Sequence, residues 1–181
     1  AGPDGKVFGY FGPAWFIDYC LCDASLQYPN APKEKGNGTY GDWAFCKGPK
    51  AFSWGGTWIC AANGTDNIKL IHDIMYTLTC KQDVMETIAK ETGDFTNNEN
   101  AMKKIADSDY HNAFLGGQNH IQLFLENALM IRKDCLSPYD QGISEKLQLC
   151  FVPYFEGYIN EEQAWQYFYK EIETLYPQLS H

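Results

Sequence analysis

The feature that most constrains this chain is a series of helical apolar stripes, which begins near residue 65 and continues to the C-terminus. Residues spaced i, i+3, i+4 and i+7 share one face of an α-helix, so such a stripe predicts a helix with one buried face. Stripes of this kind occur at residues 71–78, 84–89, 101–105, 121–128, 143–154 and 165–175. The sequence therefore predicts about six helices in this part of the chain.

Several of these helices carry signals at their ends. Asn160 precedes an acidic first turn with Gln163 at the third helical position, which predicts a capped start for the last helix. Asn97 or Asn98 is expected to cap the helix at 101–105. Gly93 suits the position that follows the helix at 84–89, where a left-handed backbone is common.

Residues 1–65 have a different pattern. Residues 6–11, 43–46 and 58–62 are rich in aromatic or β-branched side chains and predict strands. Residues 14–21 predict a short helix after the Gly12-Pro13 break, and residues 27–41 predict a loop. The expected fold class is α/β, with a few strands followed by about six helices. Because so few strands cannot complete a sheet, we expect part of the sheet to be missing.

Charge excludes several classes of partner. The net charge is −9, and the 14 Lys and Arg residues are scattered. An acidic chain repels phosphate backbones and anionic lipid, so no nucleic acid partner is expected. No apolar run approaches the roughly 20 residues needed to span a bilayer.

Cysteine and histidine give no sign of a metal site. The number of cysteines is odd, so at least one thiol is free; they are Cys20, Cys22, Cys46, Cys60, Cys80, Cys135 and Cys150. The Cys20-Leu21-Cys22 pair is too close for a CxxC motif, and no His stands at ligand spacing. His72 is expected on a solvated helix face, and His181 is the last residue. This cysteine usage favours a reducing compartment or an anaerobic source, and no metal or cofactor is expected.

No catalytic motif points to an enzyme. The chain has no GxSxG, P-loop or dinucleotide-binding fingerprint. The carboxylate pair of a glycoside hydrolase is set by position in space, so it cannot be read from spacing. Asp18, Asp42, Glu126 and Asp140 are candidates in that sense alone. We therefore expect a binding protein, with a glycoside hydrolase as the alternative.

Two aromatic clusters carry the prediction of a ligand. They are residues 12–16, Gly-Pro-Ala-Trp-Phe, and residues 52–58, Phe-Ser-Trp-Gly-Gly-Thr-Trp. Indole rings stack on the flat C–H faces of sugars, and glycines let backbone groups approach the hydroxyls. A Trp-Gly-Gly-Thr-Trp turn therefore has the parts of a carbohydrate site. The alternative is that these Trp side chains pack in the core.

The order of several motifs resembles family 1 extracellular solute-binding proteins, the carbohydrate-binding components of ABC importers. The resemblance covers nearly the whole chain. The segments that carry it are residues 6–15, 47–49, 54–62, 65–67, 114–119 and 157–164. Each motif is modest alone, and their order makes the match fairly specific.

The resemblance implies an incomplete type II periplasmic-binding-protein-like α/β fold. Residues 1–181 would be the C-terminal portion of a two-lobed protein, with segments in both lobes. The implied function is to bind a sugar or oligosaccharide and deliver it to an ABC importer, with the membrane permease subunits as partners. The full-length protein would be extracellular, as a cell-surface lipoprotein, or periplasmic. A carbohydrate-binding module without a transport role is a further alternative.

The resemblance also implies a set of ligand-binding residues. Trp15 would stack on the sugar, and the turn formed by Trp54, Gly55, Gly56 and Thr57 would line the cleft. The further candidates are Asp42 and Asn119. As a fragment of a longer protein, the chain is expected to bind saccharides weakly by itself. Its unpaired sheet edges also predict a dimer, or an element exchanged between copies.

Overall fold

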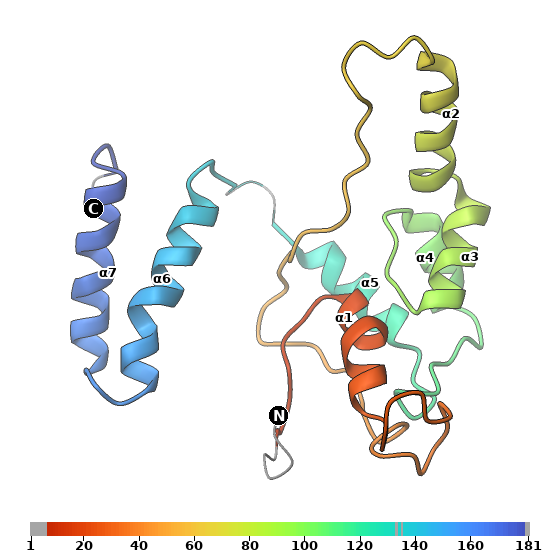
Figure 1. Cartoon of the computed structure of the whole chain (residues 1–181), viewed down its shortest axis with the longest axis horizontal. Helices are drawn as coiled ribbons and strands as arrows, with labels where there is room; N and C mark the ends of the chain where they lie inside the picture. The colour runs from red at the N-terminus through yellow and green to blue at the C-terminus, as the bar shows by residue number, and fades with distance from the viewer. Residues whose placement is uncertain (1–6, 133, 135, 180–181) are drawn as a thin grey trace. The chain divides into compact units, whose positions relative to one another are not determined.

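A computed structural model of the chain describes residues 7–132, 134 and 136–179 (Figure 1). The chain divides into two compact units, Ala1–Ile131 and Arg132–His181. Every regular element in the described residues is helical. In chain order they are α1 (Ala14–Phe16), the π-helix η1 (Ile17–Cys22), α2 (Ile68–Thr79), α3 (Gln82–Thr92), α4 (Glu99–Ala106), α5 (His120–Met130), α6 (Asp140–Phe155) and α7 (Glu161–Leu175).

The predicted α/β fold of the type II periplasmic-binding class is wrong. The described residues contain a single isolated β-bridge, between Asn112 and Gln118, and no sheet. Residues 7–11, 43–46 and 58–62 were expected as strands, but none of them forms a ladder; Lys6, in the first of these runs, lies outside the described residues. A strand forms only where a neighbour offers backbone donors and acceptors, and no described segment offers them here.

The core of the first unit lies between α3, α4 and α5. Met102, Ile105 and Ile121 are fully buried, and Met85 and Ala89 of α3 close the cluster. These are the stripes that the periodicity predicted for residues 84–89, 101–105 and 121–128. Gly93 ends α3 with φ of +71°, which confirms its expected role.

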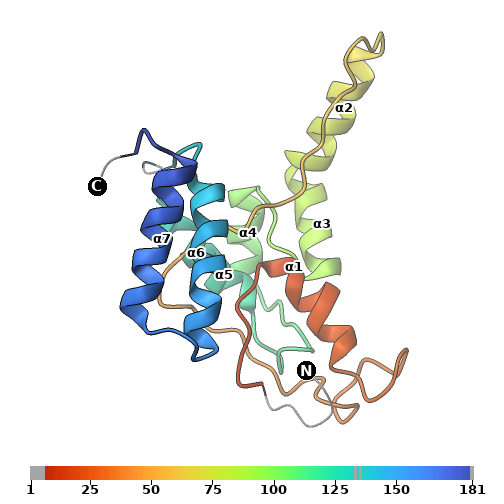
Figure 2. The same cartoon turned by 60° about the vertical axis from the view of Figure 1, so that its left-hand side comes forward.

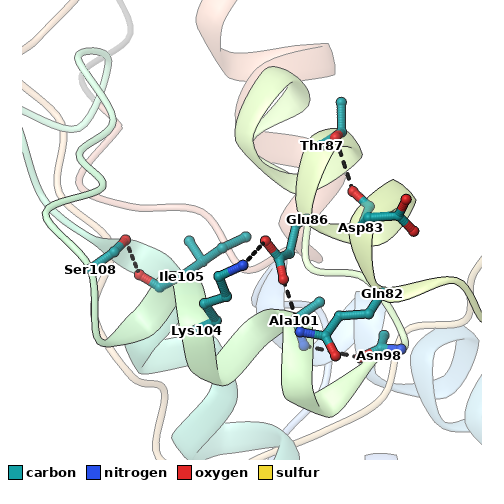
Figure 3. Close-up of polar contacts among 9 residues, drawn as sticks. All are labelled: Gln82, Asp83, Glu86, Thr87, Asn98, Ala101, Lys104, Ile105 and Ser108. Atoms are coloured by element: carbon teal, nitrogen blue, oxygen red, sulfur yellow. Dashed lines mark hydrogen bonds and ion pairs between the residues drawn. The ribbon is translucent and has the colours of Figure 1, made fainter.

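Polar contacts cap the start of α4 and join its last turn to α3. Asn98 accepts a hydrogen bond from the Ala101 amide at 2.9 Å, so Asn98 is the cap. Lys104 of α4 forms an ion pair with Glu86 of α3 at 2.7 Å (Figure 3). These contacts fix how α4 begins and lies beside α3.

A second cluster packs beneath η1. The buried members are Ile17, Cys22, Tyr40, Phe114 and Leu115. The predicted helix at 14–21 therefore forms, but most of it has π-helical hydrogen bonding, a geometry that is rare in proteins. Its buried face anchors the segment that carries Trp15.

In the second unit, α6 and α7 form an antiparallel hairpin, side by side in both views (Figures 1 and 2). Cys150, Phe168 and Ile172 are buried between them. The capping box of Asn160 and Gln163 is present, which confirms the predicted start of α7. Trp165 and Leu175, predicted in the buried stripe, are instead 37% and 44% exposed.

Helix α2 forms where the periodicity predicted it, but its apolar face is uncovered. None of its residues is buried, and Ile74 and Leu78 of the predicted stripe are 46% and 47% exposed. The spacing of a stripe predicts a helix, whereas burial needs a partner that the described chain does not place there.

Candidate functional site

Five aromatic side chains gather around α1, and we call them the α1 aromatic surface: Tyr10, Trp15, Phe16, Tyr19 and Trp43. The Trp15 ring centroid lies 6.4 Å from those of both Phe16 and Tyr19, in edge-on geometry. Tyr10 joins the segment before α1 to Phe16 and to Trp43, with centroid distances of 5.9 Å in both cases. Short local spacing along the helix and one crossing segment thus bring the rings together.

Much of the α1 aromatic surface faces solvent. Tyr10 is 44% exposed, Trp15 is 40% exposed and Tyr19 is 80% exposed. Trp15 stays outside the core because Ile17 and Cys22 take the buried face of the same helix. Trp43 is held by its indole N–H, which donates to Thr39 Oγ1 at 2.9 Å. The cluster therefore has one ring, that of Trp43, held by a hydrogen bond, and other rings that are accessible to solvent.

One carboxylate, Asp18 of η1, directly precedes Tyr19 in the chain and is exposed. Burial raises the pKa of Asp94, and the negative charge of Asp18 on η1 adds to the shift. The charge of Asp18 contributes in the same direction for Tyr40 and Tyr110, whose pKa values are raised mainly by burial. Asp94 was not singled out from the sequence, because only its burial distinguishes it from other acidic residues.

The remaining hydrolase candidates have structural contacts. Glu126 pairs with Lys47 at 2.5 Å, and the Asp140 carboxylate accepts the Ser137 amide at 3.0 Å. Asp42 is exposed beside Trp43, and its backbone amide donates to Thr39 O at 3.1 Å. Asp42 is therefore the one of these three that stands next to the α1 aromatic surface.

Residues 54–57 were expected as a turn, but the structure has no turn or bend there, and they are not joined to that surface. Within the described chain, the Trp54 ring contacts only the ring of Phe52, at 6.3 Å between centroids. Gly55 has φ of +106°, a conformation that suits glycine, and Gly56 and Thr57 are exposed. The structure therefore does not bring Trp15 and residues 54–57 into one cleft.

Asn119 has a structural role. Its side-chain amide donates to Ile105 O at 3.1 Å and to Ala106 O at 3.2 Å, which satisfies carbonyls at the end of α4. Its Oδ1 atom is buried without a partner in the described chain. These contacts orient Asn119 toward α4, so the predicted ligand contact has no support from its geometry.

The second unit has an aromatic hollow that sequence reasoning missed. It has a volume of about 540 Å³ and lies along α6, where Trp165 of α7 closes one side. We call it the α6 hollow, and it is lined by Gln141, Ser144, Glu145, Leu147, Gln148, Phe151, Phe155 and Trp165. The signal was a polar row at i, i+3, i+4 and i+7 from Gln141 beside a row of aromatics.

Within the described residues, the six cysteines are free thiols, and no group of three or more His, Cys, Asp or Glu side chains could hold a metal ion. Cys135 and His181 lie outside the described residues. His72 is exposed next to Asp73, as expected for a solvated helix face. No helix in the described part of the chain is both long and apolar enough to cross a membrane.

Comparison of the chain with protein-family models, with curated proteins and with solved structures finds no match.

Proposed function

We propose that the chain binds a neutral saccharide on the α1 aromatic surface, with Trp15 stacking on a sugar ring. The observation that carries this proposal is the position of Trp15, which is 40% exposed at the start of a helix while its neighbours Phe16 and Tyr19 hold its ring edge-on. A ring that is already ordered loses little conformational entropy when it stacks on a ligand.

Neighbouring groups support a polyhydroxyl ligand. Asp18 and Asp42 are exposed beside these rings in the sequence and offer carboxylate acceptors for hydroxyl groups. The net charge of −9 disfavours phosphorylated and other anionic ligands. Aromatic faces with a few acceptors at their rim favour an uncharged sugar or oligosaccharide.

We further propose that the saccharide is delivered to an ABC importer. This part rests on the order of the sequence motifs between residues 6 and 164. The sheet that the same resemblance implied is absent from the described residues. The permease subunits are the proposed membrane partners in this step.

The experiment compares two tryptophans of similar exposure. Trp15→Ala removes the proposed stacking ring, and Trp165→Ala removes a ring that is 37% exposed in the α6 hollow. Each protein is titrated with neutral oligosaccharides of several linkages, and binding is measured by ligand-observed NMR, which detects weak association. We expect Trp15→Ala to weaken binding about tenfold, since about 1.4 kcal/mol of lost stacking is a factor of ten. Trp165→Ala should bind as the parent does.

Two outcomes would contradict the proposal. Loss of binding in Trp165→Ala alone would move the site to the α6 hollow. Unchanged affinity in Trp15→Ala, with a large drop in melting temperature, would make Trp15 a core residue. The same incubations are scored for released reducing sugar, because product formation abolished by Asp18→Asn would favour the glycoside hydrolase instead.

A further inference from the structure

An arm of the first unit has both its backbone and its apolar side chains uncovered. It comprises the extended residues 51–62, a turn at residues 63–66 and helix α2, which runs back from that turn (Figure 1). We call residues 51–79 the arm. The arm consists of a strand-like segment followed by a helix. Such elements normally pack in two layers around a core, and the described chain provides no second layer here.

The extended half has unpaired backbone groups. Phe45 is hydrogen-bonded through Gln118, but no backbone amide or carbonyl of residues 46–61 bonds to any described residue. The nearest backbone bond runs from the Thr65 amide to Ala62 O, in the turn. A segment of this kind is a template for pairing with another extended chain.

The side chains of the same segment favour burial. Phe52, Trp54 and Trp58 are 48%, 59% and 86% exposed. An aromatic side chain buries about 150–250 Å², so these three alone leave roughly 400 Å² to cover. That is about half of the 800 Å² that each partner contributes to a standard interface.

Helix α2 adds an uncharged stripe to the arm. Ile74 and Leu78 are about half exposed, and Ile71 and Met75 lie on the same face at helical spacing. The charged residues are elsewhere on the helix, where Lys69 pairs with Asp73 at 2.7 Å. Two such stripes can meet without like charges facing each other, although each chain carries a net charge of −9.

We propose that the arm is a homodimer interface, in which residues 51–62 pair antiparallel with the same residues of a second copy and the apolar stripe of α2 covers the pair. A two-fold axis makes this surface self-complementary. If residue i of one copy contacts residue j of the second, then residue j of the first contacts residue i of the second. A pair of strands alone is marginal in water and needs to pack against a helix for stability. In the dimer, each copy supplies one strand and one helix.

The test measures the mass of the full chain by sedimentation equilibrium, from low micromolar to hundreds of micromolar protein. The parent should reach twice its monomer mass of 20.6 kDa. Ile59→Pro removes a backbone donor from the extended half, and Leu78→Lys places a charge in the stripe. Ile59 and Leu78 are 38% and 47% exposed and belong to no buried cluster in the single copy, so far-UV circular dichroism should be unchanged. We expect each variant to raise the dimer dissociation constant at least about tenfold.

His72→Lys is the matched control, because it adds a charge to α2 on its exposed polar side. It should dimerise as the parent does. Amide hydrogen exchange gives a second readout: residues 51–62 should be protected in the dimer and unprotected at the lowest concentration. A parent that stays monomeric throughout, or a dimer that survives either Ile59→Pro or Leu78→Lys, overturns the proposal.

Discussion

The side-chain amide of Gln118 makes both of its hydrogen bonds with the backbone of one residue, Phe45. Gln118 Oε1 accepts the Phe45 amide and Gln118 Nε2 donates to the Phe45 carbonyl, each at 2.8 Å. This pair of bonds copies the exchange between two residues of an antiparallel ladder. One side chain thereby ties the segment around Phe45 to the turn before α5.

Gln118→Ala should destabilise the first unit. A net hydrogen bond contributes about 0.5–1.5 kcal/mol, so the loss of two predicts a fall of about 1–3 kcal/mol in the free energy of unfolding. Gln118→Glu keeps the acceptor and loses the donor, so it should fall between Ala and the parent. Urea denaturation measures both, with Gln166→Ala on the exposed side of α7 as the control. Equal stability of Gln118→Ala and the parent would contradict this.

His120 predicts a dependence of stability on pH. It is fully buried, and because a carbonyl can only accept, His120 Nε2 donates its proton to Gly93 O at 2.7 Å. Its Nδ1 has no partner in the described chain, so a second proton there would be a buried charge without an acceptor. Burial therefore lowers the pKa of His120 below 6.5, and the Gly93 bond only partly offsets this.

The direction in which stability changes with pH follows from the protons that each state binds. The unfolded state takes up a proton near pH 6.5 and the folded state only at lower pH, so this contribution is complete above about 6.5 and is lost as pH falls. We expect the free energy of unfolding to drop as pH falls below about 6.5, by at most about 1.4 kcal/mol per pH unit from this group. His120→Gln should flatten that slope, whereas His111→Gln, at an exposed site, should leave it unchanged.

Local signals predicted the helices because each depends on neighbours in the sequence. The Asn98 and Asn160 caps, the Gly93 end and the buried Ile105 all follow from spacing within one turn or two. The strands failed for the opposite reason. Residues 58–62 have strand-type side chains, but pairing depends on a partner that the sequence does not identify.

The candidate site was predictable in part. Trp15 is exposed beside other rings, as an aromatic at a helix start after Gly-Pro can be. The contacts of Asn119 with the end of α4 could not be predicted, because they join residues 13 positions apart in the sequence. The α6 hollow was missed because Trp165 was expected in the stripe that Phe168 and Ile172 occupy alone.

Asn98 is expected to stabilise α4 in two ways. Its Oδ1 caps the Ala101 amide, and its Nδ2 donates to Cys80 O at 2.9 Å. Asn98→Ala should lower the free energy of unfolding by about 1–2 kcal/mol, the upper part of the range for a lost cap. Asn98→Asp keeps the cap and loses the bond to Cys80. Its melting temperature should therefore lie between those of the parent and Asn98→Ala. Equal melting temperatures for Asn98→Asp and Asn98→Ala would show that the bond to Cys80, and not the cap, stabilises α4.

A last pair of variants separates burial from periodicity. Ile105 and Ile74 both stand in helical apolar stripes, but Ile105 is fully buried and Ile74 is 46% exposed. Ile105→Ala removes packing and leaves a cavity, so it should cost about 2–5 kcal/mol of unfolding free energy. Ile74→Ala should cost less than about 0.5 kcal/mol in dilute protein, as exposed sites do. If α2 is covered in a dimer, the cost of Ile74→Ala should grow with protein concentration in the same urea titrations, while that of Ile105→Ala stays constant.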